Sequence, residues 1–147
     1  MSGIYFIVWD NNRKDKSEVL KTTIGGYPHT TFFYSGEKYN REKLLGFAKT
    51  LLPEFVEQKV KIVGCRVHSL LHQKSGKMCH YVLMDLDDEF SQFMTNERNS
   101  FKEEGVFMDD PHITHSIHWV KEEAEERCAA LKRLLPIEVM ITGVTID

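Results

Sequence analysis

Two short stretches of the chain place a histidine and a threonine two positions apart, each directly after a proline. The first stretch reads PHTT and the second reads PHIT. Residues i and i+2 of a strand point to the same face of a sheet. His29 is therefore expected to project with Thr31, and His112 with Thr114. If the two strands are neighbours, two imidazoles and two hydroxyls meet on one surface.

These four side chains would meet the needs of phosphodiester cleavage. An imidazole has an ordinary pKa of about 6.5, so a pair can supply one base and one acid around neutral pH. The base deprotonates a ribose 2′-OH or a water, and the acid protonates the leaving oxygen. Threonine hydroxyls can donate hydrogen bonds to the non-bridging phosphate oxygens. This chemistry requires no metal ion and no cofactor, and none is predicted.

Either motif alone is more typical of a structural histidine at the start of a strand. The repetition of proline, histidine and threonine in both halves favours catalysis. Beyond the motifs, His118 is expected on the face of His112 and is a candidate substrate contact, with a surface histidine as the alternative. Tyr5 and Phe33 are candidate contacts to a nucleobase, which stacks on aromatic rings.

A metal site is the competing interpretation of the later histidines. His112, His115 and His118 are three positions apart, which would bring them together on a helix. On a strand they do not share a face, and no cysteine or histidine pair completes a known zinc spacing. Lys74 and Lys77 could meet outer phosphates of a substrate, although a solvated turn is the simpler interpretation.

Hydrophobic periodicity predicts an alternation of strands and amphipathic helices. Strands are expected over 3–9, 27–36, 60–71, 79–87, 110–119 and 137–146, and helices over 15–21, 41–55, 87–105 and 121–135. Each half thus runs strand, helical segment, strand beginning Pro-His-x-Thr, amphipathic helix, strand. This order predicts one α+β domain over 1–147, with two pseudo-equivalent halves, a largely antiparallel sheet and helices outside.

The stretches PHTTFFYSG and PHITHSIHW resemble the paired H-x-T motifs of the two-histidine (2H, LigT-like) phosphoesterase superfamily. The resemblance implies a bilobed α+β fold with both motifs in a central cleft and metal-independent cleavage of ribonucleotide phosphoesters. It also implies that His29 and His112 are the acid–base pair, and that Thr31 and Thr114 orient the phosphate.

Within the superfamily the chain is most similar to the small phage anti-CBASS phosphodiesterases, which also begin with a short Gly-hydrophobic-Tyr strand. That similarity implies a cyclic di- or trinucleotide substrate, cut at 3′–5′ linkages by 2′-OH attack, in evasion of host defence. His115 departs from the pattern, since a leucine or similar residue is usual there. Alternatives are a 2′,3′-cyclic phosphodiesterase, an enzyme of 2′–5′ RNA processing, and a non-catalytic protein that sequesters nucleotides.

Composition limits the partners of the chain. A formal net charge of −3 argues against long nucleic acids but does not exclude a local basic pocket for a small anion. Three scattered cysteines suit a reducing compartment, and the apolar N-terminal run is too short to span a membrane. We therefore expect a cytoplasmic protein, in the host cell if a virus encodes it, with no membrane partner. The oligomeric state is left open.

Overall fold

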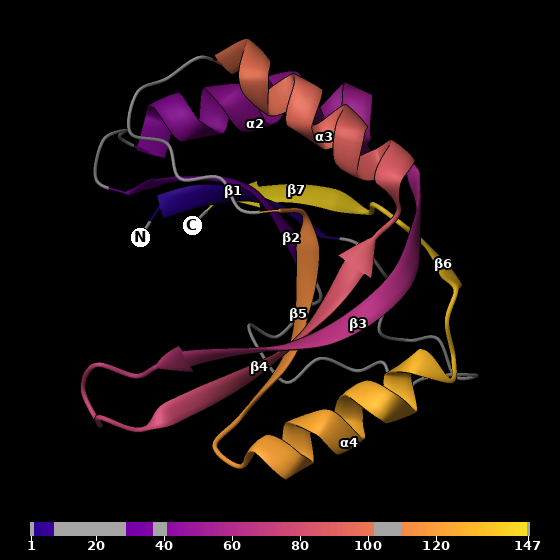
Figure 1. The fold of residues 1–147 in the computed structure, drawn as a ribbon. Coiled ribbons are helices and arrows are strands. Elements are labelled where there is room, and N and C mark those ends of the chain that lie inside the picture. Colours follow the sequence, from indigo (N-terminus) through magenta and orange to yellow (C-terminus); the bar gives the residue numbers. More distant parts are fainter. Residues whose placement is uncertain (1, 8–28, 37–40, 102–109, 147) are drawn as a thin grey trace.

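A computed structural model describes residues 2–7, 29–36, 41–101 and 110–146 of the chain (Figure 1). The strands are β1 (Ser2–Ile7), β2 (His29–Gly36), β3 (Lys59–Leu71), β4 (Met78–Leu86), β5 (His112–His118), β6 (Ile137–Met140) and β7 (Gly143–Ile146). The helices are α2 (Arg41–Phe55), α3 (Asp88–Phe101) and α4 (Lys121–Lys132). The chain is thus α+β, as predicted. The short helix expected over 15–21 lies outside the described residues.

The strands form one antiparallel sheet in the order β6-β3-β4-β5-β2-β1-β7. β2 and β5, the strands that begin at His29 and His112, are neighbours near its centre, which meets the condition for the two motifs to converge. β3, which follows β2 and α2 in the chain, pairs with β4 and β6, and β7, which follows β6, pairs with β1.

The C-terminal segment corrects one prediction. A single strand was expected over 137–146, but β6 and β7 occupy opposite edges of the sheet. Ile141 continues the hydrogen bonding of β6 to the residues just before β3: its N–H donates to Gln58 O, and its carbonyl accepts from Glu57 N–H. Only three peptide steps join Met140 to Gly143, a span of at most about 11 Å. Because this span joins both edges, the sheet must curl until they lie close together (Figure 1).

A row of buried residues crosses five strands and defines one face of the sheet. Cross-strand pairs join Phe6 to Thr30, Thr30 to Ile113, Ile113 to Met84, and Met84 to Cys65. All five side chains are at most 5% exposed. Residues that face each other across strands point to the same side. The row therefore marks one continuous face, which we call the helix face.

Helices cover both ends of this row. At one end the ring of Phe55, from α2, stacks on Phe6 with the centroids 4.3 Å apart. At the other end Cys65 faces Cys128 of α4, and burial together with this second thiol raises the pKa of Cys65. The Cys65 thiol therefore stays protonated at neutral pH. Figure 1 shows α2 and α3 above one part of the sheet and α4 below the other.

One carboxylate joins a strand to the start of a helix. Oδ2 of Asp87 accepts from the backbone N–H of Phe90 at 3.1 Å and so caps the first turn of α3. Its Oδ1 accepts from the N–H of Lys61, in β3, at 2.8 Å. Asp87 therefore sets where β4 ends and α3 begins.

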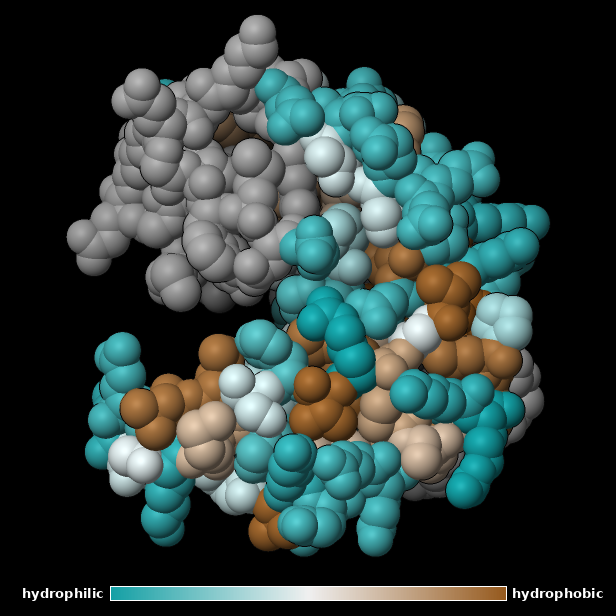
Figure 2. All heavy atoms as spheres, in the orientation of Figure 1, coloured by the Kyte–Doolittle hydropathy of each residue, from teal (hydrophilic) through white to brown (hydrophobic). Residues whose placement is uncertain are grey.

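The outer end of the β3–β4 hairpin lies away from the core. Leu70, Leu71 and Met78 are 48%, 62% and 46% exposed. Figure 2 shows hydrophobic residues among hydrophilic ones at the lower left, where this hairpin projects. None of the helices in the described part of the chain has the length and apolar character needed to cross a membrane.

Thr30 gives the first testable prediction. Its side chain is 0% exposed, and within the described structure no partner lies within hydrogen-bonding distance of Oγ1. A buried hydroxyl without a partner costs about 1–3 kcal/mol. Thr30→Val keeps the shape and removes the hydroxyl, so the free energy of unfolding should rise by about 1 kcal/mol. Urea unfolding measures this change, and a lower midpoint would show that the hydroxyl contributes to stability.

Candidate active site

The four motif residues emerge on the face opposite the helices. The β2–β5 pairing has Thr30 opposite Ile113 on the helix face. One residue to either side, the antiparallel register puts His29 across from Thr114, and Thr31 across from His112. All four of these side chains are partly exposed. Cβ atoms of such opposed residues lie about 5 Å apart, so the sheet itself brings the motifs together. We call this surface the motif face.

Two parallel rows of cross-strand pairs carry the four residues. One row runs Thr31, His112, Asp85 and Gly64, and the other runs His29, Thr114, Leu83 and Arg66. The rows extend from β2 across β5 and β4 to β3. A charged pair, Asp85 and Arg66, therefore shares the motif face with the histidines and threonines.

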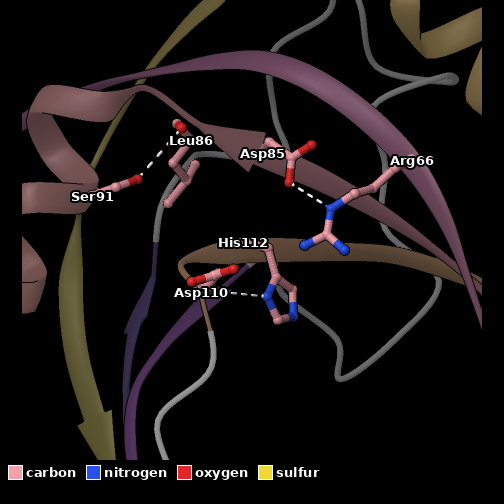
Figure 3. Close-up of polar contacts among 6 residues, drawn as sticks. All are labelled: Arg66, Asp85, Leu86, Ser91, Asp110 and His112. Atoms are coloured by element: carbon pink, nitrogen blue, oxygen red, sulfur yellow. Dashed lines mark hydrogen bonds and ion pairs between the residues drawn. The ribbon is translucent and has the colours of Figure 1, made fainter.

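A hydrogen bond to the backbone just before β5 orients the ring of His112. Its Nδ1 lies 2.8 Å from the backbone carbonyl oxygen of Asp110 (Figure 3). A carbonyl can only accept, so Nδ1 carries the hydrogen and donates it. In the neutral ring this leaves the lone pair on Nε2. Nε2 is therefore the nitrogen of His112 that can take a proton from a substrate, and that donates it when the ring is protonated.

Two predicted base contacts lie on strands whose side chains are only partly described. Tyr5 stands opposite Thr31 in the β1–β2 register, and Phe33 stands opposite Ile4. The side chains of Tyr5 and Phe33 lie outside the described residues. The backbone of Tyr5 lies beside Thr31, which is one of the motif residues. The base contacts proposed for Tyr5 and Phe33 stay predictions.

A β-bulge at His115 corrects the expected orientation of the end of β5. Leu83 pairs with Thr114, and the next residue of β4, Val82, pairs with Ser116. His115 has no counterpart in this register, which is the arrangement of a bulge. The extra residue shifts the alternation by one position. Ser116 and the residues after it therefore point opposite to the direction expected from strict period-two spacing.

His118 illustrates the consequence. Its Nε2 lies 2.8 Å from Oγ of Ser116, which is 1% exposed, and its Nδ1 lies 3.9 Å from a carboxylate oxygen of Glu123 on α4. The ring of His115 also contacts this hydroxyl, at 3.0 Å. His118 thus lies between β5 and α4 on the helix face. The prediction that it shares the face of His112 is wrong, and its proposed substrate contact loses its geometric basis.

Arg66 and Asp85 are the residues on the motif face that sequence reasoning missed. Nε of Arg66 donates to Oδ1 of Asp85 at 2.9 Å (Figure 3). A Cβ added at Gly64, across from Asp85, would lie 3.3 Å from Oδ2, so this position suits a glycine. No local signal in the sequence could identify the pair, because its position beside His112 depends on the register of three strands.

The lysines suggested for outer phosphates lie elsewhere. Lys74 and Lys77 are exposed in the turn that joins β3 to β4. The last pair of this hairpin, Leu71 with Met78, is five residues along β3 from Arg66, or about 17 Å. The two lysines are therefore far from the motif residues along the sheet.

The described residues contain no cluster of three or more histidine, cysteine, aspartate or glutamate side chains suited to a metal ion. Comparison of the chain with protein-family models, with curated proteins and with solved structures found no match. Function is therefore inferred from the residues and their arrangement.

Proposed function

We propose that this chain is a metal-independent phosphodiesterase of the two-histidine type, with His29 and His112 as acid and base. The observation that carries the proposal is the pairing of β2 with β5. This pairing puts both H-x-T motifs on adjacent central strands and on the same, partly exposed face. A structural role for either histidine would not require this convergence.

The mechanism uses each histidine once in each step. One neutral imidazole removes the proton of a ribose 2′-OH, whose oxygen attacks the adjacent 3′-phosphorus in line. The bond from phosphorus to the 5′ oxygen breaks, and the other histidine, as imidazolium, protonates that oxygen. The product is a 2′,3′-cyclic phosphate, and its hydrolysis uses the same groups with their roles exchanged. His112 acts through Nε2, because Nδ1 is held by Asp110.

Thr31 and Thr114 stabilise the negative charge that develops on the reacting phosphate. Each threonine lies across from the histidine of the other motif, so the reacting phosphate is flanked by two hydroxyls and two imidazoles. The hydroxyls donate to the non-bridging oxygens, where negative charge accumulates in the transition state. The pseudo-symmetric arrangement suits a reaction in which acid and base exchange roles.

The proposed substrate is a cyclic di- or trinucleotide messenger cleaved at 3′–5′ linkages, as the resemblance to anti-CBASS enzymes implies. A bilobed 2H fold with the motifs in its cleft is part of the same proposal, supported by the sheet order, in which β2 and β5 are neighbours near the centre. The net charge of −3 favours a small ligand over long RNA. Opening of 2′,3′-cyclic phosphates and cleavage of 2′–5′ linkages are the alternative activities of the same site.

Product analysis tests this proposal. The purified chain is incubated in EDTA with 3′–5′ cyclic dinucleotides, cyclic trinucleotides, 2′–5′ oligoadenylate and nucleoside 2′,3′-cyclic phosphates. We expect linear products from a cyclic oligonucleotide, with a 2′,3′-cyclic phosphate as the first species. Loss of activity in EDTA would contradict the metal-free mechanism. Recovery of intact ligand after denaturation would instead indicate a protein that sequesters nucleotides.

A further inference from the structure

The ion pair between Arg66 and Asp85 lies at the edge of the motif residues. We propose that Arg66 binds a second phosphate of the substrate, next to the one that is cleaved. This inference rests on the proposed function and narrows its substrate class to oligonucleotides with at least two phosphodiester groups. Nucleoside 2′,3′-cyclic phosphates, which have one phosphate, could not use this contact.

The register places Arg66 on the correct surface. Arg66 pairs with Leu83, and Leu83 pairs with Thr114, so Arg66 ends the row that holds Thr114 and His29. Asp85, its partner, pairs directly with His112 in the neighbouring row. The ion pair therefore spans both rows that carry the motifs. The cation is on the motif face and not on the helix face.

The guanidinium is held in a way that leaves its outer nitrogens available. Asp85 accepts from Nε, and within the described residues this is the one polar contact that the structure gives to Arg66. In Figure 3 the two Nη atoms lie on the side of the guanidinium toward His112. A planar guanidinium presents parallel N–H groups that match two oxygens of a phosphate. Its fixed orientation reduces the entropy lost when a phosphate binds.

Distance assigns Arg66 to a neighbouring phosphate and not to the cleaved one. The cleaved phosphate must lie between β2 and β5, among the two histidines and two threonines. Asp85, which holds the guanidinium, is on β4, so about one and a half strand spacings, or about 7 Å, separate β4 from that point. A hydrogen bond from nitrogen to oxygen spans about 3 Å. We therefore assign the fork of Arg66 to a phosphate displaced from the reaction centre toward β4.

The pair contributes little to stability, which removes the simplest alternative explanation for it. The side chains of Arg66 and Asp85 are 44% and 35% exposed. Solvent-exposed ion pairs of this kind contribute little, because water screens the charges and the side chains lose entropy. Lys59 lies at the start of β3, where this strand pairs with β6 and not yet with β4. It forms an ion pair with Glu138 that is even more exposed. It is a suitable control for the loss of one positive charge from β3.

Two measurements test the inference. The first is the binding of 2′-deoxy cyclic diadenylate and diguanylate, which lack the attacking hydroxyl, to the wild type, Arg66→Gln, Arg66→Lys and Lys59→Gln. The second is kcat/KM for a ribose cyclic dinucleotide and for a nucleoside 2′,3′-cyclic phosphate. Removal of hydrogen bonds to a charged group should weaken binding by Arg66→Gln about ten- to hundredfold. Arg66→Lys should recover only part of the loss, since it lacks the planar fork.

The substrates distinguish the possible outcomes. We expect Arg66→Gln to lose activity on the cyclic dinucleotide but to retain activity within about twofold on the 2′,3′-cyclic phosphate. We expect Lys59→Gln to match the wild type on both substrates. An equal loss on both substrates, unchanged binding by Arg66→Gln, or no binding to the wild type would overturn the inference. Cleavage with no dependence on Arg66 would leave the proposed function in place. Arg66-dependent binding without cleavage would support the second phosphate contact and contradict the phosphodiesterase.

Discussion

Alanine at either His29 or His112 is expected to reduce kcat by about 10²–10⁴-fold, the usual contribution of a positioned acid or base. The two histidines are on neighbouring strands and face the same side, so the removal of either one should slow the same step of the reaction. Both are partly exposed, and neither belongs to the buried row that stabilises the sheet. The free energy of unfolding should therefore change little. Initial rates on a cyclic dinucleotide and urea unfolding measure the two quantities.

Two controls separate catalysis from a general effect of losing a histidine. His72, exposed in the β3–β4 turn and hydrogen-bonded to Ser75, should tolerate alanine with unchanged kcat. The double variant His29→Ala/His112→Ala should lose little more than either single variant, because groups that act in one step are not additive.

The wild type should show a bell-shaped dependence of kcat/KM on pH. More than half of the wild-type activity in either single variant would exclude that histidine from the chemistry.

Valine at Thr31 or Thr114 is expected to lower kcat by about 10²–10³-fold, as the loss of one donor to a transition-state oxyanion does. Valine keeps the branched shape and strand preference of threonine and removes only the hydroxyl. The neighbouring Thr30 is the matched control, because its side chain points to the helix face and is 0% exposed. Thr30→Val should keep full activity, whereas Thr31→Val, one position away, should lose it.

The shape of the pH profile distinguishes the threonines from the histidines. A threonine does not titrate in the working range, so Thr31→Val and Thr114→Val should lower kcat at every pH without altering the bell shape. Each histidine variant should instead lose one limb of the profile. Equal activity of Thr30→Val and Thr31→Val would show that the hydroxyl on the motif face has no catalytic part.

Local patterns in the sequence determined most of the secondary structure and the identity of the motif residues. Amphipathic spacing predicted α2 and α4 to within three residues of their bounds and the start of α3 to within one residue, and the end expected for α3 lies outside the described residues. Alternation predicted that His29 and Thr31 share a face, and that His112 shares one with Thr114. These properties depend on the geometry of a single helix or strand, with periods of 3.6 and 2 residues, and so can be read from neighbouring positions.

Pairing between distant strands decided what the sequence could not. The bulge at His115 turns His118 to the helix face, and a bulge exists only relative to the register of the strand beside it. The separation of β6 from β7 depends on the curl of the whole sheet. The position of Arg66 near His112 depends on three strands in register. The sequence by itself therefore determined which residues are candidates for the proposed chemistry, and the tertiary structure decided which of them meet, because cross-strand register is a long-range property.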